Sequence, residues 1–71
     1  MKTLDLHGLK HLEAKEKIKD FIFSGDIEFP CSIITGQSNA MKNMTINILN
    51  EHDFNWIIKA HNTGEIIILC R

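Results

Sequence analysis

Two polar residues at the end of the first apolar run could carry out chemistry together. Residues 4–8 read Leu-Asp-Leu-His-Gly, so Asp5 and His7 are two apart and point to the same side of a strand. A carboxylate beside an imidazole favours the imidazolium and orients the ring. Such a histidine can donate a proton or bind a phosphate oxygen. The alternative, which these residues alone favour, is that both are polar residues on a less buried face.

A second candidate is the turn Thr-Gly-Gln-Ser-Asn at residues 35–39, which runs into a helical pattern. Backbone N–H groups at a helix N-terminus attract anions. Lys42, in the first turns of that helix, could add a positive charge, and Ser38 or Asn39 can cap it. The alternative is an ordinary capped turn between a strand and a helix.

Metal and thiolate chemistry have less support. The remaining histidines and both cysteines lack metal-ligand spacing to one another: His11, His52, His61, Cys31 and Cys70. We therefore predict no cofactor, and this spacing does not support a divalent metal ion. Both cysteines adjoin residues expected in the core, which disfavours a cysteine nucleophile. The sequence has no nucleophile elbow, phosphate-binding P-loop or dinucleotide fingerprint.

The surrounding pattern predicts the elements that position these motifs. A first strand is expected over residues 3–6. A helix follows, with Ala14 beside an apolar stripe at helical spacing: Leu9, Leu12, Ile18, Phe21 and Ile22. We expect Gly25 to be the C′ residue that ends this helix and Pro30 to block any continuation.

The second half of the chain repeats the alternation. A strand is predicted over residues 31–35, and the next helix, fading near residue 52, has one apolar face: Met41, Met44, Thr45, Ile48 and Leu49. Residues 56–60 and 65–69 predict an antiparallel hairpin, in which Gly64 is available for a positive φ in the turn. We favour Trp56 as a core residue over a base-stacking one.

The order β-α-β-α-β-β predicts an α/β chain built as an α+β two-layer sandwich. We expect one domain over residues 1–71, with two helices and a four-stranded mixed sheet. In open sheets of this kind, ligands bind beyond the carboxyl ends of the parallel strands. If the first two strands are neighbours, both motifs therefore lie on the same rim.

Charge and composition limit the partners. The formal net charge is −1, which does not suggest coating of nucleic acid by bulk electrostatics but leaves room for a local phosphate site. Two distant cysteines and no apolar leader fit a reduced cytoplasmic protein. No apolar run approaches membrane-spanning length. We expect a monomer or weak oligomer.

The two motifs and the element order resemble the Smr (small MutS-related) domain family across essentially the whole chain. The resemblance implies the fold of the C-terminal domain of a bacterial translation initiation factor and an endonuclease that nicks DNA or cleaves RNA. It implies a catalytic pair, Asp5 and His7, and a phosphate-facing loop around Gly36. Position 38 holds Ser where the family's second motif usually has Gly.

The leading hypothesis is therefore a small nuclease acting on DNA or RNA. Together the two motifs supply these candidate nucleic-acid contacts: Gly8, Thr35, Gly36, Gln37, Ser38, Asn39 and Lys42. The alternative is a module that binds nucleic acid or ribonucleoprotein without cleaving it. A more remote one is a protein-interaction domain that uses the edge of the terminal hairpin.

Overall fold

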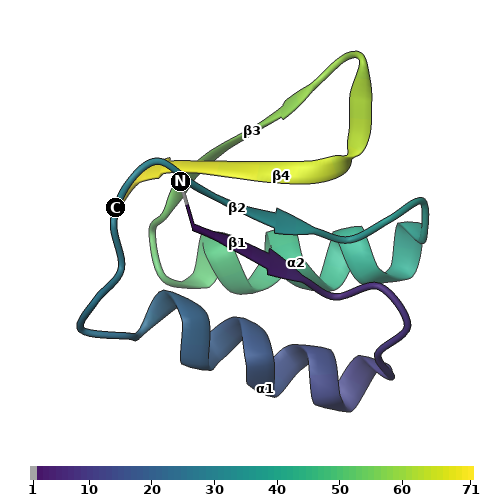
Figure 1. Cartoon of the computed structure of the whole chain (residues 1–71), viewed down its shortest axis with the longest axis horizontal. Coiled ribbons are helices and arrows are strands. Elements are labelled where there is room, and N and C mark those ends of the chain that lie inside the picture. The colour runs from purple at the N-terminus through teal and green to yellow at the C-terminus, as the bar shows by residue number, and fades with distance from the viewer. Residues whose placement is uncertain (1) are drawn as a thin grey trace.

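Apolar residues at helical and alternating spacing build two layers in the computed structural model, which describes residues 2–71 (Figure 1). The elements follow the predicted order: β1 (Thr3–Asp5), α1 (His11–Ile22), β2 (Cys31–Ile34), α2 (Asn39–Glu51), β3 (Asn55–Lys59) and β4 (Asn62–Cys70). The sheet order is β1-β2-β4-β3. β1 and β2 run parallel, whereas β4 is antiparallel to both β2 and β3. The predicted two-layer fold with a mixed sheet is confirmed.

The core lies between the sheet and the two helices, which occupy the same side of it in Figure 1. α1 contributes one buried stripe, Ala14, Ile18 and Ile22, because residues four apart share a helix face. α2 and the central strands supply further buried side chains, among them Met41, Thr45, Ile48, Leu49, Ile33, Ile66 and Ile68. The prediction that Leu12 belongs to the buried stripe is wrong. Leu12 is 73% exposed, since it lies about 200° around the helix from Ala14.

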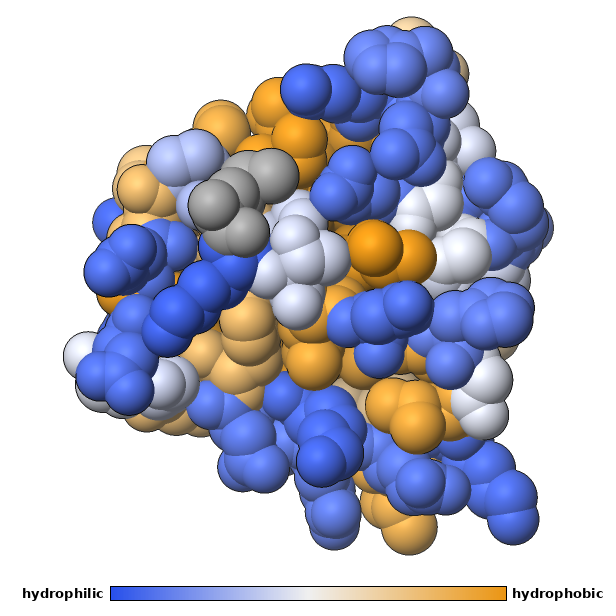
Figure 2. Space-filling model, in the orientation of Figure 1, coloured by the Kyte–Doolittle hydropathy of each residue, from blue (hydrophilic) through white to orange (hydrophobic). Residues whose placement is uncertain are grey.

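The face of the sheet away from the helices is partly apolar. Along β4, Ile66 and Ile68 are fully buried towards the helices, so Ile67 and Leu69 point the other way. Ile57 of β3, which pairs with Ile67, is exposed on this second face. Hydrophobic residues, drawn in orange, reach the surface among blue hydrophilic ones in the space-filling view (Figure 2).

The start of α2 agrees with the prediction, whereas the end of α1 does not. Ser38 is the N-cap of α2, as predicted, and its hydroxyl oxygen accepts the Met41 N–H at 3.2 Å. At the end of α1, Phe23 is the cap and donates its N–H to the Lys19 carbonyl. The prediction of Gly25 as a C′ residue in the left-handed region is wrong, because the chain has already left the helix and only Gly8 and Gly36 among the described glycines have positive φ.

Replacing Ser38 by alanine is expected to lower the free energy of unfolding by about 1 kcal/mol. The reason is that the Met41 N–H at the start of α2 loses its acceptor. Urea denaturation would measure the change. Asn39→Ala, at the next position and exposed, is the control and should leave stability nearly unchanged; equal stability of Ser38→Ala and the parent protein would refute the cap.

The terminal hairpin is tighter than predicted. Lys59 pairs with Asn62, so only Ala60 and His61 form the loop. The register then shifts between Ile58 and Lys59, which leaves residues 63–65 of β4 outside the regular pairing with β3. Gly64 therefore lies within β4 and has no positive φ, so the prediction that it serves the turn is wrong.

Candidate functional site

The first motif forms a turn at the end of β1 and not a continuation of the strand. β1 stops at Asp5, and the Leu9 N–H donates to the Leu6 carbonyl at 3.1 Å. Gly8 has a φ of 82° at the third position of this turn, the geometry of a type II turn, which glycine adopts without strain. His7 therefore occupies the corner of the turn, where it is exposed.

Asp5 contacts the backbone of His7. Its Oδ1 accepts the His7 N–H at 2.9 Å. The sequence predicted that this carboxylate would orient the imidazole directly, through two side chains on one strand face. Because the strand ends before His7, the carboxylate instead bonds the main chain at the start of the turn. Asp5 thus acts on the ring only by fixing the turn that carries it.

The hydrogen bond from the His7 N–H to Asp5 can be tested by comparing two substitutions of Asp5. Asp5→Asn retains a side-chain oxygen that can accept the His7 N–H, whereas Asp5→Ala does not. We expect Asp5→Ala to lower the free energy of unfolding by about 1 kcal/mol, with Asp5→Asn closer to the parent. Urea titrations of the three proteins would measure this. If the asparagine variant lost as much as the alanine variant, the negative charge and not the hydrogen bond would be the important property.

The second motif lies directly beside this turn. The parallel pairing continues beyond β1, since the Leu6 N–H donates to the Ile34 carbonyl at 2.9 Å. A Cβ placed on Gly36, which has a φ of 68°, would lie only 3.9 Å from Cδ2 of the His7 ring. The predicted neighbourhood of the two motifs at the carboxyl ends of β1 and β2 is therefore confirmed. We call this region, His7 to Gly8 with residues 35–40, the rim.

Two of the predicted phosphate donors are already occupied. The Thr35 and Gly36 N–H groups both donate to the Gly64 carbonyl, at 2.8 and 3.1 Å. The buried Thr35 hydroxyl is within hydrogen-bonding distance of the Gly36 and Gly64 carbonyls, at 3.1 and 3.3 Å. These two residues hold the loop against β4. They are not amide donors for a ligand.

The backbone amides of the next residues, 37–40, are not bonded to β4 in this way. Within residues 2–71, the backbone N–H groups of residues 37–40 make no hydrogen bond to other backbone segments, as expected where a helix begins. The dipole of α2 adds partial positive charge at the same place. Gln37, Ser38 and Asn39 are exposed, and Lys42 is partly buried in the second turn. The rim therefore offers an anion a row of amides beside an imidazole.

Gly64, which was predicted only for the hairpin turn, lies against the loop of the second motif. A Cβ at this position would lie 3.2 Å from the Gly36 oxygen and 3.3 Å from Nε2 of Gln37. Next to it, the Thr63 hydroxyl donates to Oε1 of Gln37 at 3.2 Å. A glycine inside an apolar strand pattern indicates a bulge or a close backbone approach. This pattern is the feature of the sequence that could have identified the role of Gly64.

The remaining candidates lie away from the rim. Cys31 is buried, and burial raises the pKa of its thiol; Cys70 is exposed at the end of β4. Trp56 is half-buried against the core, with its indole N–H donating to Oδ1 of Asn50 at 2.9 Å. This arrangement agrees with the preference for packing over base stacking.

Within residues 2–71, no three histidine, cysteine or acidic side chains cluster closely enough to hold a metal ion. None of the helices there combines the length and apolar character needed to cross a bilayer. Comparison of the chain with profiles of known protein families, with curated proteins and with solved structures found no match.

Proposed function

We propose that this protein is a small Smr-like endonuclease that binds a nucleic-acid phosphate at the rim and cleaves the phosphodiester with His7. The observation that carries the proposal is the closeness of the two motifs, since Cδ2 of His7 lies 3.9 Å from the position that a Cβ added to Gly36 would take. One phosphate held by the amides of residues 37–40 would therefore lie beside the imidazole. The resemblance of residues 4–8 to the family motif supports the same assignment.

Phosphodiester hydrolysis needs a larger rate enhancement than one imidazole supplies, so several groups at the rim must act together. Hydrolysis adds water across a P–O bond, so one proton leaves the attacking water and one reaches the departing oxygen. His7 is placed to take the first or to supply the second, which contributes about 10² to 10⁴ in rate. Amide donors at the start of α2 would stabilise the charge that grows on the phosphate oxygens. The free thiols of Cys31 and Cys70 fit a cytoplasmic setting.

One observation favours a second candidate, a module that binds nucleic acid without cleaving it. The Asp5 carboxylate bonds the backbone and not the imidazole, so His7 lacks the oriented ring that a carboxylate partner gives a catalytic histidine. The row of amides and the ring would still bind a phosphate. The two candidates thus share a site and differ in whether the bond breaks.

Incubation of the purified protein with single- and double-stranded DNA and RNA separates them. Cleavage that is abolished in His7→Ala, while binding persists, is the result expected of the endonuclease. Binding of the same substrates without any product at matched protein concentration would sink the nuclease and leave the binding module. Absence of binding to all four substrates would overturn both.

A further inference from the structure

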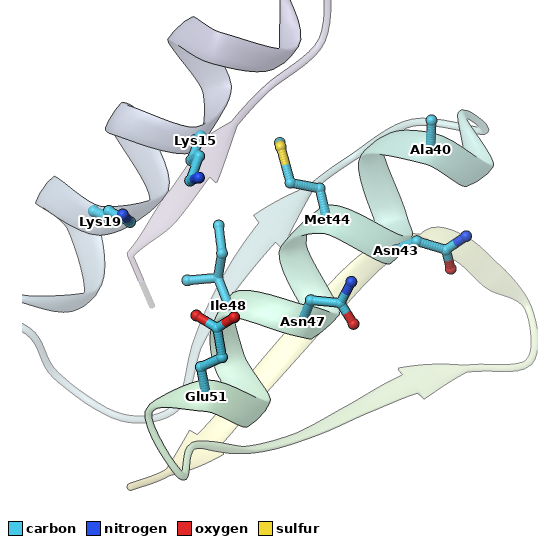
Figure 3. Close-up of a pocket in the computed structure, with 8 residues that line it drawn as sticks. All are labelled: Lys15, Lys19, Ala40, Asn43, Met44, Asn47, Ile48 and Glu51. Atoms are coloured by element: carbon cyan, nitrogen blue, oxygen red, sulfur yellow. The ribbon is translucent and has the colours of Figure 1, made fainter.

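A groove separates α1 from α2 on the outer side of the helical layer (Figure 3). Its volume is about 490 Å³, and eight residues line it: Lys15, Lys19, Ala40, Asn43, Met44, Asn47, Ile48 and Glu51. Figure 3 shows the two lysines on α1 and the other six residues along α2.

The lining combines three kinds of chemistry. Met44 and Ile48 are apolar, half-buried and buried respectively. Asn43 and Asn47 are exposed amides, each able to donate and accept hydrogen bonds. Lys15 and Lys19 are exposed ammonium groups one helical turn apart, and their charge suits phosphate oxygens. A ligand that matches all three has flat apolar faces, polar edges and regularly spaced negative charge.

We propose that this groove binds single-stranded nucleic acid, with bases against the Met44 side and backbone phosphates at Lys15 and Lys19. In a duplex the bases are stacked and paired internally, so their faces are not available to such a surface. In a single strand the base faces are free, and the half-buried Met44 offers them an apolar side chain to pack against. The strongly polar walls and the paired lysines argue against an apolar peptide helix as the occupant.

The groove adjoins the rim at Ala40, and this inference deepens and rests on the function proposed there. Ala40 lines the groove and is also the last of the amides that open towards the rim. From Ala40 to Glu51, α2 runs about 16 Å, which exceeds the length of one nucleotide unit. A strand whose phosphate occupies the rim therefore continues between the helices.

Glu51 sets the far limit of the groove. It is the last residue of α2 and lines the groove at the end away from Ala40. A carboxylate there repels a backbone phosphate, so the bound strand ends or turns away at this point. Glu51→Gln removes the repulsion and should strengthen binding of strands long enough to reach it.

Fluorescence anisotropy with a short labelled single-stranded RNA, the matching single-stranded DNA and the matching duplex tests the groove. Lys15→Gln and Lys19→Gln should each weaken single-strand binding by roughly threefold to tenfold. Each should also lower the slope of log affinity against log salt by about 0.7. Lys17→Gln is the matched control, because it removes the same charge from the opposite side of α1, about 200° away from Lys15. Circular dichroism would check that every variant folds.

The outcomes separate this inference from the nuclease. If the Lys15 and Lys19 variants bind like Lys17→Gln, the groove is refuted whether or not the protein cleaves. If they lose affinity but no substrate is cut, the groove stands and the nuclease fails. Duplex binding as tight as single-strand binding, with the same lysine dependence, would overturn the assignment of a single strand.

Discussion

Replacing His7 by alanine is expected to lower the rate of phosphodiester cleavage by about 10² to 10⁴. The imidazole lies at the rim beside the second loop, with its Cδ2 3.9 Å from the position that a Cβ on Gly36 would take, and histidine is a common general acid or base. Single-turnover cleavage measured beside equilibrium binding would separate the two effects. Affinity should fall far less than rate, since the amides of residues 37–40 remain.

The matched control is His11→Ala. His11 is four residues away, exposed and the first residue of α1, so the substitution removes the same kind of side chain without altering the turn. The His11→Ala variant should cleave at the same rate as the parent protein. Equal rates for His7→Ala and the parent would remove His7 from the mechanism, and equal losses in both variants would indicate a general effect of charge.

Replacing Gly64 by valine is expected to lower the free energy of unfolding by about 3 kcal/mol. The new Cβ would lie 3.2 Å from the Gly36 oxygen and 3.3 Å from the Gly36 carbonyl carbon, and backbone atoms cannot move aside as a side chain can. The same shift would strain the hydrogen bonds from Thr35 and Gly36 to the Gly64 carbonyl. Thermal or urea unfolding would measure the loss.

Gly25→Val is the control for this change. A Cβ at Gly25 would meet no atom within 4 Å, and Gly25 has no positive φ. Its effect should stay well below that of Gly64→Val. If the two valine variants were equally stable, the close approach of β4 to the second loop would not be what requires glycine. We also expect Gly64→Val to weaken nucleic-acid binding at the rim, because the loop that presents residues 37–40 would be displaced.

Local pattern explains why so much of the fold was predictable. Apolar spacing of three and four in α2 and the capping hydroxyl of Ser38 act within a few residues, so they can be read without knowing the fold. The order of elements then required a parallel crossover between β1 and β2. That crossover brought His7 and Gly36 to one edge, as the sequence predicted.

Local pattern does not predict a contact whose partner is distant in sequence. Leu12 has helical spacing to other apolar residues yet is exposed, because the direction of the buried stripe depends on where the sheet lies. The local sequence around Gly64 fits a turn as well as it fits a bulge within a strand. The Gly64 carbonyl accepts bonds from Thr35, 29 residues earlier, and no local pattern encodes such a contact.

Periodicity, capping and crossover rules predict the six elements, their order and the meeting of the Asp5–His7 run with the loop around Gly36. The hydrogen-bond partner of each polar group there depends on tertiary packing. In the folded chain the Asp5 carboxylate accepts the His7 N–H, and the Gly64 carbonyl accepts the N–H groups of Thr35 and Gly36. The packing of the two helices also leaves the groove beside Lys15 and Lys19. Hydrogen-bond partners and helix separation depend on how distant segments pack, and packing is fixed only when the whole chain has folded.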